Sequence, residues 1–181
     1  MATEPANSQP LQLTIRQAVS SDATRMQSGF DANMGWRKPR GYFEHMFGLQ
    51  ETGDLILLVA YLPEEAYAGH CKVVWKPRYP PYREQGIPEI QDLNVLPKYQ
   101  RNGIASRLVD VAEDLIRERS PIAGIRFGLY ADYGPAQRMY VLRGYVPDGQ
   151  GISYMSKPVE AGERVRVDDM LTLALIRRLE P

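Results

Sequence analysis

The sequence has few of the residues that form disulfides or bind metal ions in small proteins. Among its 181 residues Cys71 is the only cysteine, so no disulfide can form within the chain, which fits a reducing cytoplasm. The two histidines, His45 and His70, have no ligand-like spacing to each other or to Cys71. Because a metal site needs three or four converging ligands, we expect no metal centre and a cytoplasmic protein.

Net charge and long apolar runs are also lacking. The 22 Lys and Arg residues balance 22 Asp and Glu residues. Phosphate neutralisation dominates the affinity of proteins that hold nucleic acids, so the missing basic excess argues against such a partner. No apolar run reaches membrane-spanning length, and no basic segment followed by an apolar core begins the sequence. We therefore expect neither nucleic-acid nor membrane partners.

What is present indicates one α/β (α+β) domain over residues 11–181 after a flexible, polar tail over residues 1–10. Apolar alternation and short apolar runs predict strands over 11–15, 55–61, 67–75, 89–95, 125–129 and 170–176, with short strands near 145 and over 152–155. Helical spacing predicts helices from about 23, and over 41–49, 103–118 and 135–142. Residues 76–88, rich in proline and tyrosine, are expected to form an ordered loop. This order is typical of a mixed, mostly antiparallel sheet with a strand–helix–strand crossover.

The segment from Asp92 to Ala105 carries the clearest chemical signal. A strand stops at Pro97 and a helix begins at Gly103, so the turn delivers consecutive backbone N–H groups to the positive end of the helix dipole. Such a junction binds phosphate, and a glycine lets the anion approach closely. The alternative is a plain connection capped by Asn102. The turn lacks the Gly-Lys-Ser/Thr sequence of a P-loop. It also lacks the three spaced glycines of a Rossmann fingerprint.

Two segments resemble the acyl-CoA signatures of the GNAT N-acyltransferase superfamily. The first signature, Gln/Arg-x-x-Gly-x-Gly/Ala, is matched by Gln100-Arg101-Asn102-Gly103-Ile104-Ala105. The second, Ala-x-x-x-Tyr-x-x-x-Gly-Phe, is matched by Ala136, Tyr140, Gly144 and Tyr145. Many members carry asparagine seven residues before that tyrosine, where this chain has Tyr133. The resemblance implies about four helices around the sheet and two central parallel strands that splay apart to hold acyl-CoA.

The resemblance also implies a function. The superfamily transfers an acyl group from the thioester directly to an amine in a ternary complex, so this chain would use acetyl-CoA to acetylate a primary amine of a small molecule, peptide or protein. The pantetheine arm would pair with the strand backbone, and an N–H near Leu93 would polarise the thioester carbonyl. Cofactor contacts would come from Leu93, Asn94, Val95, Gln100, Arg101, Asn102, Gly103, Ile104, Ala105, Tyr133 and Ala136.

Catalysis requires removal of a proton from the amine, because an alkyl ammonium has a pKa of about 10. Glu89 and Asp92 are the candidate bases, with ordered water as the alternative. Glu89 lies eleven residues before Gln100, where histone-acetylating members carry a glutamate base. Tyr140 would protonate or hydrogen-bond the departing thiolate, or else would only pack on the sheet.

The sequence leaves alternatives open for the amine acceptor site and for the function of the protein. The residues Trp75, Tyr79, Tyr82 and Arg83 would form an acceptor pocket, or their loop is simply a rigid surface segment. A non-catalytic acyl-CoA-binding module or sensor is the alternative function. A GNAT toxin that acts on charged tRNA is disfavoured by the absent basic excess. A homodimer is compatible with the sequence.

Overall fold

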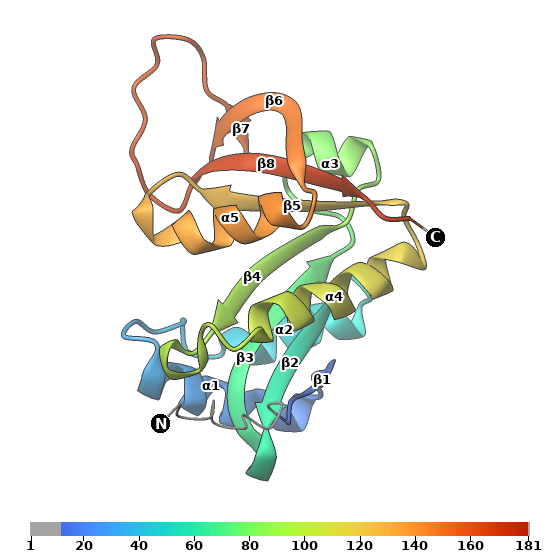
Figure 1. Cartoon of the computed structure of the whole chain (residues 1–181), viewed down its shortest axis with the longest axis vertical. Helices are drawn as coiled ribbons and strands as arrows, with labels where there is room; N and C mark the ends of the chain where they lie inside the picture. The colour runs from blue at the N-terminus through green and yellow to red at the C-terminus, as the bar shows by residue number, and fades with distance from the viewer. Residues whose placement is uncertain (1–11, 181) are drawn as a thin grey trace, which may run out of the picture.

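The computed structural model describes residues 12–180, so the tail expected over residues 1–10 lies outside the described residues. One eight-stranded sheet runs in the order β1-β2-β3-β4-β5-β8-β6-β7 (Figure 1). Its strands are β1 (Thr14–Gln17), β2 (Leu55–Leu62), β3 (Ala66–Val74), β4 (Glu89–Val95), β5 (Ile122–Gly128), β6 (Val146–Tyr154), β7 (Lys157–Pro158) and β8 (Leu171–Arg178). Within this sheet β4 and β5 are the parallel pair, and the other neighbours are antiparallel.

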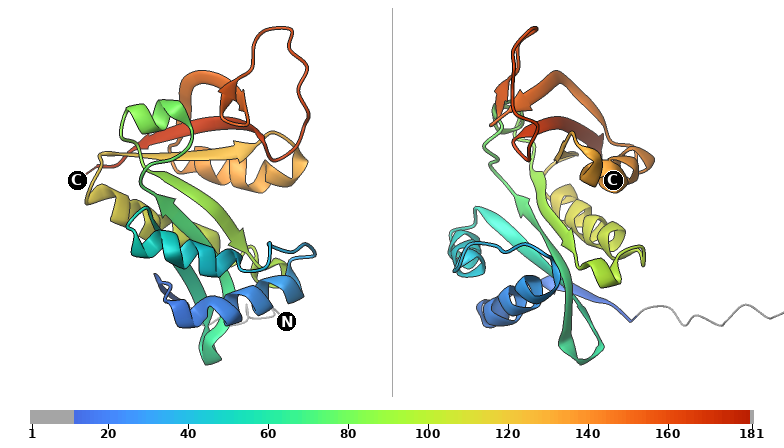
Figure 2. Two further views of the ribbon diagram at one scale, coloured as in Figure 1. Left: turned by 180° about the vertical axis from the view of Figure 1, so that it is seen from behind. Right: turned by 90° about the vertical axis from the view of Figure 1, so that its left-hand side faces the viewer.

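Helices cover both faces of the sheet. One face carries α1 (Ala23–Asn33) and α2 (Tyr42–Glu51), and the other carries α4 (Ile104–Arg117) and α5 (Gly134–Leu142) (Figure 2). The helix α4 is strongly amphipathic and buries Ile104, Leu108, Ala112 and Ile116 against the sheet. A second core lies under α1 and α2 around Met26, Phe30, Phe43 and Phe47. No helix within residues 12–180 is long and apolar enough to cross a membrane.

The two parallel strands separate soon after they begin. They pair only through Glu89 with Gly124 and Ile90 with Ile125. Beyond these residues β5 continues to pair with β8, whereas the edge of β4 that faces β5 has no partner strand from Gln91 onward. The strands therefore diverge into a V, and the expected mixed sheet with a central splayed parallel pair is confirmed (Figure 1).

Three local expectations were incomplete. Residues 80–84, expected in a loop, form the short helix α3 (Pro80–Glu84), which two prolines can begin because their fixed φ suits a first helical turn. The short strands expected near 145 and over 152–155 are one strand, β6, with a register shift between Pro147 and Ile152. The first described strand is Thr14–Gln17 and Leu13 precedes it, whereas Leu11, where the strand was expected to begin, lies outside the described residues.

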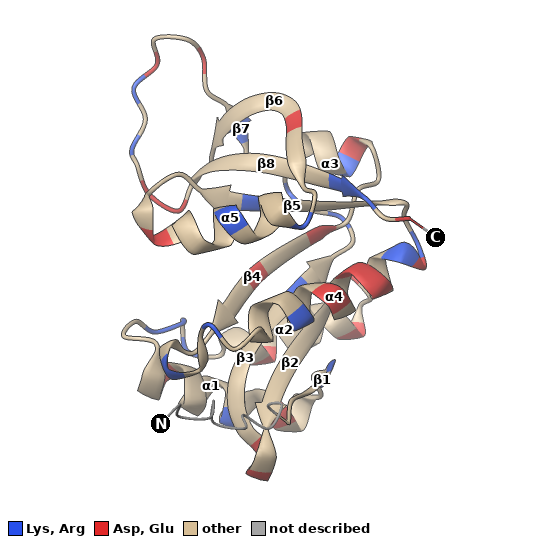
Figure 3. Ribbon diagram, viewed as in Figure 1, with Lys and Arg blue, Asp and Glu red and all other residues tan. Residues whose placement is uncertain are grey.

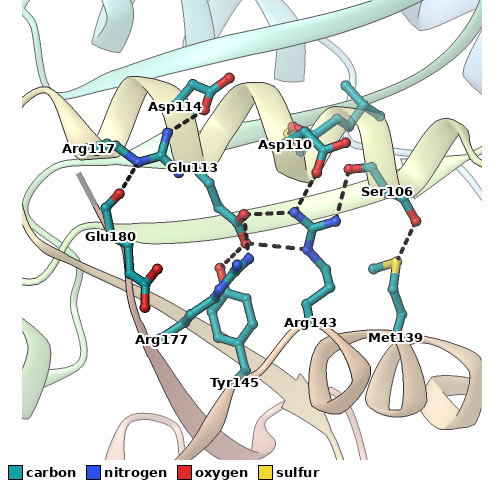
Figure 4. Close-up of polar contacts among 12 residues, drawn as sticks. Ser106, Asp110, Glu113, Asp114, Arg117, Met139, Arg143, Tyr145, Arg177 and Glu180 are labelled. Carbon is teal, nitrogen blue, oxygen red and sulfur yellow. Dashed lines mark hydrogen bonds and ion pairs between the residues drawn. The ribbon is translucent and has the colours of Figure 1, made fainter.

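A buried ion-pair cluster joins the two arms of the V on the α4 side (Figure 4). Glu113 of α4, which is 3% exposed, accepts hydrogen bonds from Arg143 and from Arg177, each at 2.7 Å. The hydroxyl of Tyr145 donates to the same carboxylate at 3.0 Å. We call these four residues the Glu113 cluster; it ties α4 to β8 and to the chain that follows α5.

Candidate active site

The turn between β4 and α4 presents a run of unpaired backbone donors. The backbone N–H groups from Arg101 to Ser106 donate to no acceptor within residues 12–180, and the first helical bond runs from Arg107 to Gly103 at 3.0 Å. Gly103 has a φ of 75° and open space where a Cβ would lie. Unpaired N–H groups at the positive end of a helix dipole form an anion site, so this turn suits a pyrophosphate.

Side chains hold that turn in place rather than cap the helix. Gln100 donates from its amide to the Val95 carbonyl at 3.1 Å, which ties the turn to the end of β4. Asn102 donates to the carbonyls of Tyr99 and Gln100 at 3.2 and 3.1 Å, so it braces the turn and does not cap α4. The first signature therefore shapes the backbone, and the N–H groups of Arg101, Ile104 and Ala105 stay free of protein partners.

A β-bulge lies in β4 where the V opens. Lys72 on β3 faces Gln91, and His70 faces Asn94, so two residues of β4 oppose one residue of β3 between these pairs. The first bulge residue, Asp92, has a φ of 56°, a left-handed conformation that aspartate tolerates better than most residues. A bulge bends its strand and re-aims the backbone, here at the open edge beside Leu93.

The Asp92 carboxylate is surrounded by donors from distant parts of the chain. Lys38, in the connection between α1 and α2, reaches the two carboxylate oxygens at 2.7 and 2.9 Å. His70 Nε2 lies at 3.0 Å and the Asn94 amide at 2.7 Å, and the Tyr42 hydroxyl donates as well. We call these five residues the Asp92 cluster. Every oxygen of the carboxylate is already engaged.

The protonation states in the Asp92 cluster follow from burial and pairing. Burial would raise the pKa of Asp92, but the hydrogen bond from His70 and the charge of Lys38 outweigh it and hold that pKa well below its usual range. Burial lowers the pKa of His70, so its ring is neutral, with Nε2 donating to Asp92 and Nδ1 accepting from the Tyr67 hydroxyl. A carboxylate that binds protons this weakly is a poor general base at neutral pH.

Glu89, the other candidate base, lies at the beginning of β4 and is 2% exposed. Its carboxylate accepts from Arg126 Nε at 2.8 Å and from the Gln91 amide at 2.8 Å. Arg126 also donates to the Ser156 hydroxyl and lies 5.0 Å from the centre of the Tyr79 ring. Glu89 therefore stands in an ion pair beside the apex of the V.

Tyr140 packs on the sheet and carries a protonated hydroxyl that has no protein acceptor among the described residues. Its ring stacks on Phe127, with centroids 6.1 Å apart, and it is 5% exposed. Burial raises the pKa of Tyr140, so the phenol keeps its proton at neutral pH. Its hydroxyl donates to no acceptor within residues 12–180. A protonated phenol without a protein partner is suited to donate a proton to a ligand in the V.

Tyr133 stands where many members of the superfamily carry asparagine, and its ring and hydroxyl contact other parts of the protein. Its ring covers Gly128 so closely that a Cβ there would lie 2.5 Å from a ring carbon. Its hydroxyl donates to Asp169, just before β8, at 3.0 Å. Ala136 lies partly buried in α5 against the core. Tyr133 thus closes the end of the β5 arm with its ring.

The four residues expected to form an acceptor pocket do not converge. Tyr82 is fully buried and donates to the carbonyls of Leu175 and Ile125, so it is a core residue. Trp75 packs under the Arg119 guanidinium, 4.2 Å from the ring centre, at the end of α4. Tyr79 is 3% exposed and donates to Asp148, and Arg83 is exposed on α3. The helical turn of α3 points the two tyrosines inward.

Sequence reasoning missed Lys38, Tyr42 and His70. Lys38 lies 54 residues and Tyr42 lies 50 residues from Asp92 in the chain, so no local spacing relates them. Three aromatic rings, from Phe30, Trp36 and Tyr42, also lie 4.9, 5.3 and 4.2 Å from the Lys38 ammonium. Within residues 12–180 no group of three His, Cys, Asp or Glu side chains could hold a metal ion.

Comparisons with known proteins agree with this geometry. No curated protein sequence matches the chain. Solved structures with the same fold include a putative GNAT acetyltransferase from Desulfovibrio desulfuricans (15% identity, 92% of this chain and 98% of that chain covered, TM-score 0.65). Others are a GNAT acetyltransferase from Streptococcus pneumoniae (17%, 93% and 100%, 0.64) and a spermidine/spermine N-acetyltransferase from Vibrio cholerae (14%, 92% and 92%, 0.62).

At these identities the structures show the fold alone. The sequence model of the acetyltransferase (GNAT) family, however, matches residues 23–145, which contain the bulged strand, the donor turn and the helix of Tyr140. The chain belongs to the GNAT acetyltransferase family.

Proposed function

We propose that the protein is an N-acetyltransferase that moves an acetyl group from acetyl-CoA to a primary amine by direct attack in a ternary complex. One observation carries the proposal: the free N–H groups from Arg101 to Ser106 adjoin the unpaired edge of β4 from Gln91 to Val95. A phosphate site beside an open strand edge suits a ligand that has a pyrophosphate at one end and amide groups along its arm.

Each segment of the V has a role in this proposal. The turn after β4 binds the pyrophosphate with its N–H groups, and Arg101 adds positive charge. The backbone of Leu93 and Val95 pairs with the amides of the pantetheine arm, with Asn94 between them. The N–H at Leu93 polarises the thioester carbonyl. Tyr133 and Ala136 flank the arm from the α5 side.

In the chemical step the amine nitrogen attacks the thioester carbon, so a C–N bond forms and the C–S bond breaks. One proton of the ammonium passes to Glu89, directly or through water, before the attack. Tyr140 gives its proton to the departing thiolate, and the second proton that the nitrogen loses as the amide forms returns to Tyr140, directly or through water. Asp92 is the weaker candidate for the base because its pKa is lowered. We assign Asp92 to holding the bulge that aims the Leu93 backbone.

Two measurements test the function. Acetyl-CoA at about 100 times its dissociation constant should stabilise the fold by about 2.7 kcal/mol, visible as a raised melting temperature that adenine alone does not give. Free thiol should then appear only after an amine is added, because the transfer is direct. Stabilisation without thiol release for any amine would favour the alternative, a non-catalytic acyl-CoA-binding module.

The base can be tested by Glu89→Gln. We expect turnover to fall most at neutral pH and to recover partly at high pH, where the free amine forms unaided. Glu118→Gln, at an exposed position in the chain after α4, is the matched control and should keep the wild-type profile. A pH–rate profile of Glu89→Gln with wild-type shape and height would assign proton removal to water instead.

A further inference from the structure

The side of the sheet that carries α2 has an unequal set of charges beside β4. Asp92 is paired with Lys38 at 2.7 Å, and Glu89 is paired with Arg126 at 2.8 Å. Lys72 lies on the same side and forms no ion pair with any carboxylate of residues 12–180. In this group of side chains both acids are neutralised and one ammonium is left over (Figure 3 shows the acidic positions along β4).

Lys72 stands next to the proposed reaction centre. It faces Gln91 in the β3–β4 register, one position before the Asp92 bulge. Among residues 12–180, its Nζ is within hydrogen-bond distance of the Tyr42 hydroxyl, at 3.4 Å, and of the Met46 sulfur, at 3.7 Å. Both are neutral, and the Tyr42 proton is already donated to Asp92.

The surroundings of Lys72 disfavour its charge. Burial lowers the pKa of Lys72, and the nearby charges of Lys38 and Arg78 add to this effect, while Asp92 and Glu89 oppose it. Buried cations in folded proteins are normally paired, and Lys72 is half-buried without an anionic partner among residues 12–180. An anionic group placed beside Lys72 would restore the balance.

Building on the proposed function, we propose that Lys72 binds a carboxylate of the acceptor, so that the substrate class is an amine that also carries a carboxylate, such as an amino acid or the end of a peptide. A polyamine is the contrasting class. Its second ammonium would need a free carboxylate, and both carboxylates beside β4 are already paired. Its charge would also be repelled by Lys72.

Matched acceptors test this assignment. Glycine, β-alanine and 4-aminobutanoate each have a carboxamide counterpart that differs mainly in the negative charge, and spermidine represents the polyamines. For the best acid–amide pair we expect kcat/KM to favour the carboxylate by about 10-fold, chiefly through KM, as expected for one charge-assisted hydrogen bond. In Lys72→Gln that ratio should fall to about one, and Lys72→Arg should restore part of it.

The control and the second readout separate this inference from the proposed function. Lys76→Gln, at an exposed position beyond the end of β3, should keep the wild-type preference. Calorimetric binding of the same acid–amide pairs to the CoA-saturated protein needs no turnover. A carboxylate preference that Lys72→Gln abolishes, without turnover of any amine, would support the Lys72 site and reject the acetyltransferase function. An unchanged ratio in Lys72→Gln, a wild-type preference for carboxamides or spermidine, or no preferential binding of carboxylates would overturn the inference.

Discussion

The Asp92 cluster and the Glu113 cluster each surround a carboxylate with hydrogen-bond donors, at least one of them a cation, yet they differ in the backbone that carries the carboxylate. Glu113 lies in the regular helix α4 and gathers Arg143 and Arg177 from the other arm of the V. Asp92 lies on a bulge with a φ of 56° and gathers Lys38 and His70 from the α1 and α2 side. None of the four residues of the first cluster has a positive φ. The second holds a strained backbone at the place where a ligand backbone would pair.

This contrast teaches that a buried ion pair can stabilise either the fold or a local geometry. Replacing each carboxylate by its amide separates the two roles, because the shape is kept while the charge is lost. We expect Glu113→Gln to act mainly on unfolding and Asp92→Asn mainly on catalysis. Four variants test this contrast.

The largest effect is expected for Glu113→Gln. Arg143 and Arg177 would lose their shared anion while remaining partly buried, and breaking a buried pair in this way typically costs about 3–5 kcal/mol. Urea unfolding measures the loss. Asp114→Asn is the matched control, because its exposed pair with Arg117 should be worth less than about 1 kcal/mol. Equal losses in the two variants would mean that the Glu113 cluster does not join the arms.

Gly103→Glu tests the open end of the V. The new side chain would enter the proposed pyrophosphate site with like charge, so acetyl-CoA affinity should fall by about 100-fold or more, which calorimetry measures. The variant should still fold, because the space beside Gly103 is open. Gly103→Asn is the control, since asparagine tolerates the left-handed conformation and adds no charge. Unchanged affinity in Gly103→Glu would place the phosphates elsewhere.

Tyr140→Phe separates a proton donor from a packing residue within the V. Turnover should fall about 10- to 100-fold, with a smaller effect on acetyl-CoA binding, because the hydroxyl acts only as the thiolate departs. Stability should fall by no more than about 1–2 kcal/mol, since the ring still stacks on Phe127. Normal turnover together with a lowered melting temperature would show that Tyr140 serves packing alone.

The effect of Asp92→Asn on stability should depend on pH. The pKa of Asp92 is lowered in the folded protein, so its charge stabilises the fold above the unfolded pKa of about 3.9 and this contribution is lost as pH falls below that value. Asparagine keeps the bulge conformation. The wild type and the variant should therefore differ most at neutral pH and converge in acid. A constant difference across pH would show that the charge of Asp92 does not stabilise the fold.

Much of the fold was predictable because its signals are local. The apolar run of β4, the turn at Gly103 and the amphipathic helix α4 are contiguous in sequence, and each lies within two residues of its expected position. The short helix α3 was missed because two prolines in a tyrosine-rich segment are typical of loops as well as of first helical turns. Because the segment was predicted to be a loop, Tyr82 was predicted to line an acceptor pocket, whereas the helical turn carries its side chain into the core.

The donor turn, the strand before it and the helix that carries Tyr140 can be read from the sequence. These depend on neighbouring residues, which glycine positions and apolar periodicity reveal directly. Which charges meet depends on the packing of distant segments. This packing brings Lys38 and His70 to Asp92, pairs Arg126 with Glu89 and leaves Lys72 without an anion among residues 12–180. A charge has the same sign wherever it stands in a sequence, but its partner and its burial depend on how distant segments pack, and these set both its pKa and what it can bind.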